Sequence, residues 1–149
     1  MATINGCELP DDLYYMIKKH VWAKEIEGGD VRVGMTAPAI KLAGGKFIAV
    51  TPKRKAIGQN LAKGKSMATV ESSKFVGPVP APVSGVLTKV NDAVADDPDL
   101  AASDPYGKGW IAEITPSDWE GEKGDLAHGK DGLEAYRDQL ESDGVDCSS

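Results

Sequence analysis

The chain has 149 residues, of which 41% are hydrophobic and 27% charged, a composition typical of one globular domain. A net charge of −6 argues against nucleic-acid binding, because phosphate recognition needs a basic face. No apolar run approaches the roughly 20 residues that span a bilayer, and the first residues lack the basic and apolar regions of a signal peptide. We therefore expect a cytoplasmic protein without a membrane span.

Charge is unevenly distributed along the chain. Residues 41–65 include seven basic and no acidic side chains. Residues 117–149 include ten acidic and three basic side chains, a balance of 3 − 10 = −7. These segments are expected to form solvated faces, and the alternative is a patch that steers a charged partner or substrate.

The two cysteines, Cys7 and Cys147, are too few for a disulfide framework. A bridge between them would join the two ends of the chain, and it is not expected in a reducing compartment. We expect Cys7 to be a free thiol near a mobile terminus.

The 17 glycines and nine prolines favour many short strands over long helices. Residues 13–17 follow a proline and two aspartates and are predicted to be helical, and residues 36–40 to form a short helical turn. Apolar or alternating runs predict strands at residues 20–23, 31–35, 46–50, 67–70, 87–90 and 109–114.

The remaining segments are expected to form turns, loops and a terminal helix. Pro78, Pro80 and Pro82 exclude a central strand, and residues 96–106 are predicted to be a loop. A C-terminal helix over about 131–141 would precede a frayed tail at 142–149. Together these elements predict one domain over 1–149, mainly β with terminal helices (α+β), built as a flattened sandwich or barrel with its core at about 20–116.

Signatures of self-contained catalysis are absent from the sequence. There is no phosphate-binding glycine loop, dinucleotide fingerprint or nucleophile elbow. The only histidines are His20 and His128, and neither has metal-ligand spacing to a cysteine. We therefore expect a carrier or binding module with no metal site, and not an enzyme.

The most informative segment surrounds Lys74. An apolar run, the polar turn Glu71-Ser72-Ser73-Lys74 and a second apolar stretch would hold one amine away from its own domain. The alternative is that Lys74 is an ordinary solvated lysine.

This segment resembles the lipoyl and biotinyl carrier domains, and among them the H protein of the glycine cleavage system. The likeness covers about residues 20–116. Besides the lysine turn, the matching motifs are His20-Val21-Trp22, Val33-Gly34-Met35-Thr36, Ala81-Pro82-Val83-Ser84-Gly85-Val86 and Asp104-Pro105-Tyr106-Gly107-Lys108-Gly109-Trp110.

The resemblance implies a barrel-sandwich hybrid with lipoate in amide linkage to Lys74, as N6-lipoyllysine. Biotin is not expected, because biotinyl lysines lie between methionines and Lys74 lies between Ser73 and Phe75. Glu71 and Ser73 would help to present the lysine to lipoate-attaching enzymes. His20 and Val21 would lie near the cleft that receives the arm.

Three features depart from the glycine cleavage pattern. Val21 replaces an acidic residue that, in the glycine cleavage protein, helps to hold the cationic amine of the aminomethylated arm. Residues 51–55 read Thr-Pro-Lys-Arg-Lys in place of a Leu-Pro-Glu motif. The N-terminal block 5–15 also differs. These features resemble the lipoate-binding proteins of heterodisulfide-reductase-like sulfur oxidation.

That resemblance implies a lipoyl arm that shuttles sulfur intermediates for a heterodisulfide-reductase-like complex, with Cys7 as a sulfur relay. The alternative is an H protein that carries an aminomethyl group between glycine decarboxylase and aminomethyltransferase, with dihydrolipoamide dehydrogenase as a third partner.

Overall fold

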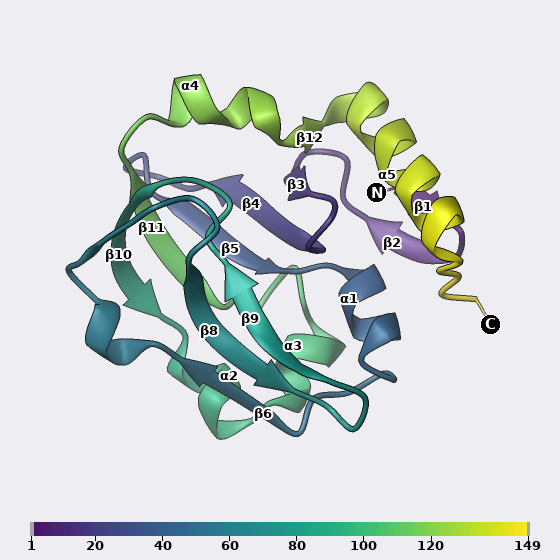
Figure 1. The fold of residues 1–149 in the computed structure, drawn as a ribbon, viewed down its shortest axis with the longest axis horizontal. Helices are drawn as coiled ribbons and strands as arrows, with labels where there is room; N and C mark the ends of the chain where they lie inside the picture. The colour runs from purple at the N-terminus through teal and green to yellow at the C-terminus, as the bar shows by residue number, and fades with distance from the viewer. Residues whose placement is uncertain (1, 149) are drawn as a thin grey trace.

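The computed structural model describes residues 2–148, and it confirms the prediction of a mainly β fold with helices at the C-terminus. Two sheets face each other to form a flattened barrel (Figure 1). A seven-stranded sheet has the order β12-β3-β4-β5-β11-β10-β7, and a three-stranded sheet has the order β6-β8-β9.

The central strands of the larger sheet are β4 (Val21–Glu25), β5 (Val31–Met35), β11 (Ala112–Pro116) and β10 (Gly85–Val90). They pair antiparallel, and their inward side chains meet those of β8 across the barrel. The main core consists of buried apolar side chains, among them Val31, Val33, Met67, Val70, Leu87, Ile111 and Ile114. Each such aliphatic side chain contributes about 1.5–3 kcal/mol on burial.

The smaller sheet forms the hairpin that carries Lys74. Strand β8 (Ser66–Glu71) pairs on one side with β6 (Ala49–Pro52) and on the other with β9 (Val76–Pro80). Because β9 lies at the sheet edge, its two prolines withdraw no hydrogen bond from a further neighbour. The prolines therefore agree with the expected exclusion of a central strand.

Short helices fill the connections. The predicted helical turn is α1 (Ala37–Leu42), and η1 (Arg54–Ala56) and β7 (Asn60–Leu61) follow β6. The prediction of a loop over 96–106 is wrong in part, because α2 (Asp92–Asp96) and α3 (Asp99–Ser103) occupy this region. The side chain of Asn91 caps α2, and the buried Val94 and Ala101 anchor the two helices on the core.

The prediction of a helix over 13–17 is wrong. The segment forms β3 (Tyr14–Met16), which pairs with β4 and with β12 (Ala127–His128), and it is preceded by the hairpin of β1 (Ala2–Ile4) and β2 (Cys7–Leu9). Tyr15 is buried while its neighbours are partly exposed, an alternation that belongs to a strand. Aspartates before a short aromatic run are therefore a weak helix signal when a sheet edge is within reach.

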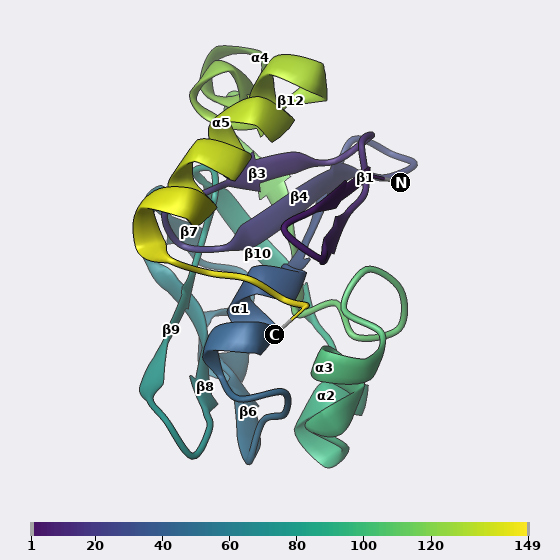
Figure 2. The same ribbon diagram turned by 90° about the vertical axis from the view of Figure 1, so that its right-hand side faces the viewer.

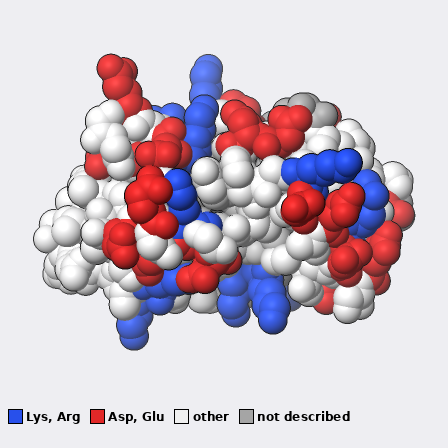
Figure 3. Space-filling model, turned by 90° about the horizontal axis from the view of Figure 1, so that it is seen from above, with Lys and Arg blue, Asp and Glu red and all other residues white. Residues whose placement is uncertain are grey.

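The C-terminal region covers one side of the barrel with α4 (Trp119–Glu122), η2 (Lys123–Asp125) and α5 (Gly129–Asp143). Carboxylates gather on the face that carries these helices, with lysines and arginines among them (Figure 3). Tyr136 and Leu140 turn inward from α5 and join a second apolar cluster with Ile4, Leu9, Leu13, Tyr15 and Trp22.

The tail beyond α5 is not frayed, which corrects the prediction for residues 142–148. The helix continues to Asp143, Val145 is buried, and the Cys147 amide donates a 2.8 Å hydrogen bond to Asn5 O. The tail passes beside α1 on its way to the terminus (Figure 2). Apolar burial and pairing with the N-terminal hairpin hold it in place.

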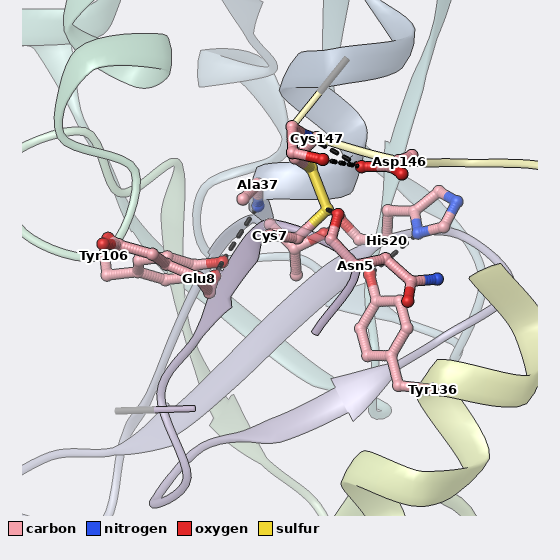
Figure 4. The surroundings of a disulfide bond; sticks show 11 residues. Asn5, Cys7, Glu8, His20, Ala37, Tyr106, Tyr136, Asp146 and Cys147 are labelled. Atoms are coloured by element: carbon pink, nitrogen blue, oxygen red, sulfur yellow. Dashed lines mark hydrogen bonds between the residues drawn. A yellow bond between two sulfur atoms is a disulfide. The ribbon is translucent and has the colours of Figure 1, made fainter. Parts of the chain in front are cut away.

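Cys7 and Cys147 form a disulfide, with their Cα atoms 5.0 Å apart (Figure 4). The prediction of a free Cys7 thiol is wrong, because β1 and β2 place Cys7 at 0% exposure against the tail. Because the two cysteines are paired, cysteine usage no longer supports a reducing compartment for this protein. Among the described residues no helix is both long enough and apolar enough to cross a membrane.

The disulfide predicts a measurable loss of stability in Cys147→Ser. The bridge closes a sequence separation of 140 residues, and chain-entropy arguments give about 2–5 kcal/mol for such a loop. We expect a thermal midpoint roughly 10 °C lower than that of the oxidised wild type. Calorimetry checks this, with reduced wild type as the control. An equal midpoint before and after reduction would contradict it.

Candidate functional site: the Lys74 turn and its cleft

The β8–β9 turn is held by one side chain. Ser72 is buried, and its Oγ accepts hydrogen bonds from the amides of Lys74 at 3.1 Å and Phe75 at 3.2 Å. The Ser72 amide in turn donates to Phe75 O at 2.9 Å. A hydroxyl that satisfies two turn amides fixes the loop locally. The Lys74 side chain is left exposed at the tip, as the sequence predicts.

The Lys74 side chain passes over the end of α1. A Cβ built on Gly44, which has φ of +89°, would lie 3.3 Å from Lys74 Cε. A side chain at this position would therefore crowd the lysine as well as strain the backbone. Gly44 leaves room for the root of the side chain.

A cleft of about 420 Å³ lies beside the lysine. Its lining is largely apolar and consists of Met35, Ala39, Leu42, Val70, Phe75 and Pro78. The polar residues that line it are Lys18, Lys19, His20 and Lys74 itself, and no aspartate or glutamate is among the described residues that line it. A hydrocarbon chain attached to Lys74 could lie along this lining, and the cations favour an anionic head group.

Exposed apolar side chains surround the turn. Of the large hydrophobic residues exposed in the described chain, all but Ile57 belong to segments around Lys74, namely Leu42, Ile48, Phe75 and Val76. Leu42 and Phe75 line the cleft, and the Ile48 amide donates to Glu71 O at 2.7 Å. We call these four residues the apolar collar. Exposed apolar side chains gathered in this way are typical of a protein contact surface.

His20 is the most constrained polar residue of the cleft. It is 7% exposed and has a left-handed backbone with φ of +57°. Its Nδ1 lies 2.8 Å from Tyr136 Oη, which lies 2.7 Å from Thr36 Oγ1.

Burial lowers the pKa of His20, and Asp143 opposes this only in part. The neutral form is therefore favoured in the fold. The stabilisation that this provides is present above the unfolded pKa of about 6.5, and it is lost as the pH falls from there through the lower pKa of the folded state.

The Pro-Tyr-Gly motif sets the position of α1. Tyr106 Oη accepts from the Ala37 amide at 2.9 Å and donates to Glu8 O at 2.6 Å. Trp22 Nε1 donates to Pro105 O at 3.0 Å. The motif therefore ties α1, and with it Gly44, to β2 and β4.

The other residues singled out from the sequence are placed as follows. Glu71 and Ser73 are exposed in or beside the turn, and in the described chain their side chains make no hydrogen bond. Val21 does not line the cleft, because it is 1% exposed in the barrel core opposite Met35.

The structure also places Cys7 and the basic segment at residues 53–55 away from the Lys74 cleft. Cys7 cannot relay sulfur in this state, because its sulfur is buried and bonded to Cys147. Lys53, Arg54 and Lys55 line a separate cleft beside η1 and not that of Lys74.

Sequence reasoning placed Ser72 in the turn without assigning it a role, and it missed Gly44, Lys18 and Lys19. Ser72 could have been found, since a serine at the start of a tight turn commonly caps its amides. The other three reach Lys74 only through tertiary packing.

The turn geometry predicts a difference between two adjacent serines. Ser72→Ala removes the acceptor of two amides, at a cost of about 1–2 kcal/mol, whereas Ser73→Ala removes no contact. We expect the Lys74 and Phe75 amides to exchange with deuterium roughly tenfold faster in Ser72→Ala. Equal exchange rates in the two variants would show that the hydroxyl does not hold the turn.

Residues 13–139 match the protein family described as the glycine cleavage H-protein. Glycine cleavage system H protein 5 of Aquifex aeolicus is 41% identical over 151 residues, which cover 99% of each chain. Probable glycine cleavage system H protein 2 of Sulfolobus acidocaldarius is also 41% identical, over 99% of this chain and 97% of the relative.

A solved structure has the same fold. The crystal structure of a glycine cleavage system H protein from Mycobacterium marinum matches with a TM-score of 0.70 and 33% identity, over 92% of this chain and 100% of that one. The chain therefore belongs to the glycine cleavage H-protein family, a family of lipoyl carriers.

Proposed function

We propose that Lys74 bears lipoate in amide linkage and that the chain presents this arm to partner enzymes. The observation that carries the proposal is an exposed amine at the tip of a rigid hairpin, beside a cleft with an apolar lining. The lining suits the methylene chain of lipoate, so the residues present fit the group. When bound, lipoate supplies a disulfide that can be reduced and can carry a group on sulfur.

Residues around Lys74 have separate roles in presenting the arm. Ser72 fixes the turn, and Gly44 leaves space for the base of the arm. The apolar collar supplies a surface that a lipoate-attaching enzyme or an arm-loading enzyme can contact. Glu71 and Ser73 lie exposed beside Lys74, where such an enzyme would meet them.

For the cargo, we propose an aminomethyl group carried between glycine decarboxylase and aminomethyltransferase, with dihydrolipoamide dehydrogenase returning the arm to its oxidised form. The support is the family match along most of the chain and the names of the similar relatives. A rigid base for the arm raises its effective concentration at each partner in turn.

A second candidate is the carriage of anionic sulfur intermediates for a heterodisulfide-reductase-like complex. One observation favours it: Lys18 and Lys19 line the cleft, and no carboxylate is among the described residues that line it. A cationic aminomethyl group would be repelled there, whereas a sulfur anion would be attracted.

The attachment site is tested by the mass of the intact protein. After co-expression with a lipoate-attaching enzyme, we expect wild type to gain one lipoyl group and Lys74→Arg to gain none. Peptide mapping assigns the modification to a residue. Lipoylation of Lys74→Arg, or an unmodified wild-type chain from its native host, would overturn the proposal.

The cargo is tested by reversing the charges of the cleft. Lipoylated wild type and Lys18→Glu/Lys19→Glu are offered glycine, decarboxylase and aminomethyltransferase, and loading is measured by mass. Aminomethyl cargo predicts that wild type is loaded and that the variant is loaded roughly two- to fivefold faster, because two like charges are removed. The exposed pair Lys24→Glu/Lys130→Glu is the matched control.

The same proteins are then offered sulfane sulfur. Sulfur cargo predicts little aminomethyl loading of wild type, and slower sulfur loading of the charge-reversed variant than of the control. Efficient aminomethylation of wild type would contradict the second candidate.

A further inference from the structure

His20, Thr36 and Tyr136 form a cycle of hydrogen bonds that determines which ring nitrogen of His20 carries the proton. Thr36 Oγ1 donates to His20 O at 3.4 Å, so the Tyr136 hydroxyl donates its proton to Thr36 Oγ1 at 2.7 Å. Tyr136 Oη is then the acceptor for His20 Nδ1–H at 2.8 Å. Burial raises the pKa of Tyr136, so this hydroxyl stays protonated and able to donate. This direction of donation satisfies all three contacts and leaves Nε2 unprotonated.

The lone pair of Nε2 has no partner in the described chain. No hydrogen bond between described residues involves Nε2, and the only fully buried side-chain nitrogen or oxygen without a partner there is Trp119 Nε1. The small exposed part of His20 therefore includes Nε2, and the residue lines the Lys74 cleft. Figure 4 shows one ring nitrogen on the side of Tyr136 and the other directed away from it. A ring held by these hydrogen bonds, with an unpartnered and partly exposed acceptor on a residue that lines the cleft, is arranged to receive a proton.

The charged residues around His20 favour the deprotonation of a thiol in the cleft. Lys18, Lys19 and Lys74 line the same cleft, and Tyr136 and Asp143 face the ring from α5. Acylation removes the charge of Lys74, so the remaining cations are Lys18 and Lys19. They oppose protonation of the imidazole, but they also stabilise a thiolate and lower the pKa of a nearby thiol. The lowered pKa of the thiol moves toward that of the imidazole. Burial, which lowers the pKa of His20, keeps the ring neutral and so able to accept a proton at pH 7.

We propose that His20 Nε2 accepts the proton of a thiol that the reduced arm of Lys74 brings into the cleft. The S–H bond breaks and the N–H bond forms, while the electron pair stays on sulfur, so the thiol becomes a thiolate and the imidazole becomes an imidazolium. No oxidant or reductant is needed. The proposal rests on lipoylation of Lys74 and concerns the reduced arm.

The left-handed backbone of His20 supports this role. A non-glycine residue with φ of +57° is costly, and the cost is offset here by two hydrogen bonds to His20 O, from the Thr36 amide and hydroxyl. Asparagine tolerates this conformation better than most residues, so His20→Asn removes the imidazole with the least backbone strain.

The first test is nitrogen NMR of the unmodified chain. With only two histidines, His128→Asn assigns the ring signals. We expect His20 at pH 7 to carry its proton on Nδ1 and none on Nε2, and Tyr136→Phe to abolish this preference. A proton on Nε2 in the wild type would overturn the proposal, because that nitrogen could then not accept one.

The second test is the pH dependence of arm alkylation in the reduced, lipoylated protein. Iodoacetamide is the probe, and mass spectrometry of the peptide that contains Lys74 follows the reaction. We expect His20→Asn to react roughly tenfold more slowly than wild type at pH 7, with its profile moved to higher pH by about one unit. Tyr136→Phe should also move the pH profile of alkylation to higher pH.

His128→Asn is the matched control for alkylation. His128 is bonded to Leu13 O and stacked on Tyr14, away from the Lys74 cleft, so its profile should equal that of wild type. Identical profiles for His20→Asn, Tyr136→Phe and wild type would overturn the proposal. A chain with no lipoate on Lys74 would instead defeat the proposed function, while the NMR result would still report on His20.

Discussion

The presentation of Lys74 depends on the pairing of β8 with β9 up to Glu71 and Val76, which leaves four residues to reverse the chain. Those four residues lie outside the β-ladder, so their amides need other hydrogen-bond acceptors, and the Ser72 hydroxyl accepts from two of them. The turn is thereby held without any contact that uses the Lys74 amine. A carrier needs this separation, because the group that is modified must be free while its support is rigid.

The second apolar cluster supports the other side of the cleft. The helix α5 delivers Tyr136 to His20, and the tail is bonded to β2 through Cys7 and Cys147. The loop that carries Lys18, Lys19 and His20 leads directly into β4, one of the central strands. The C-terminal segment is therefore part of the site, although it lies far from Lys74 in sequence.

The cleft beside Lys74 combines an apolar lining with cationic side chains and a buried histidine. Its apolar lining excludes water from methylene groups, while its polar residues are cations and one neutral imidazole. The chain as a whole is acidic, with carboxylates gathered over the C-terminal helices (Figure 3). The cationic character of the cleft is therefore local, and it arises from where the β3–β4 loop is placed.

The sequence by itself determined the frame of the fold and the lysine that we propose as the attachment site, because strand alternation, turn residues and the lysine motif are local patterns. It could not decide whether residues 13–17 form a helix or a strand, since a short aromatic run suits both until a sheet edge pairs with it. Only the tertiary structure joined Cys7 to Cys147, buried Val21 in the barrel and brought His20, Lys18, Lys19 and Gly44 around Lys74. Those placements depend on contacts between residues far apart in the chain, and no local pattern records which distant surfaces will pack together.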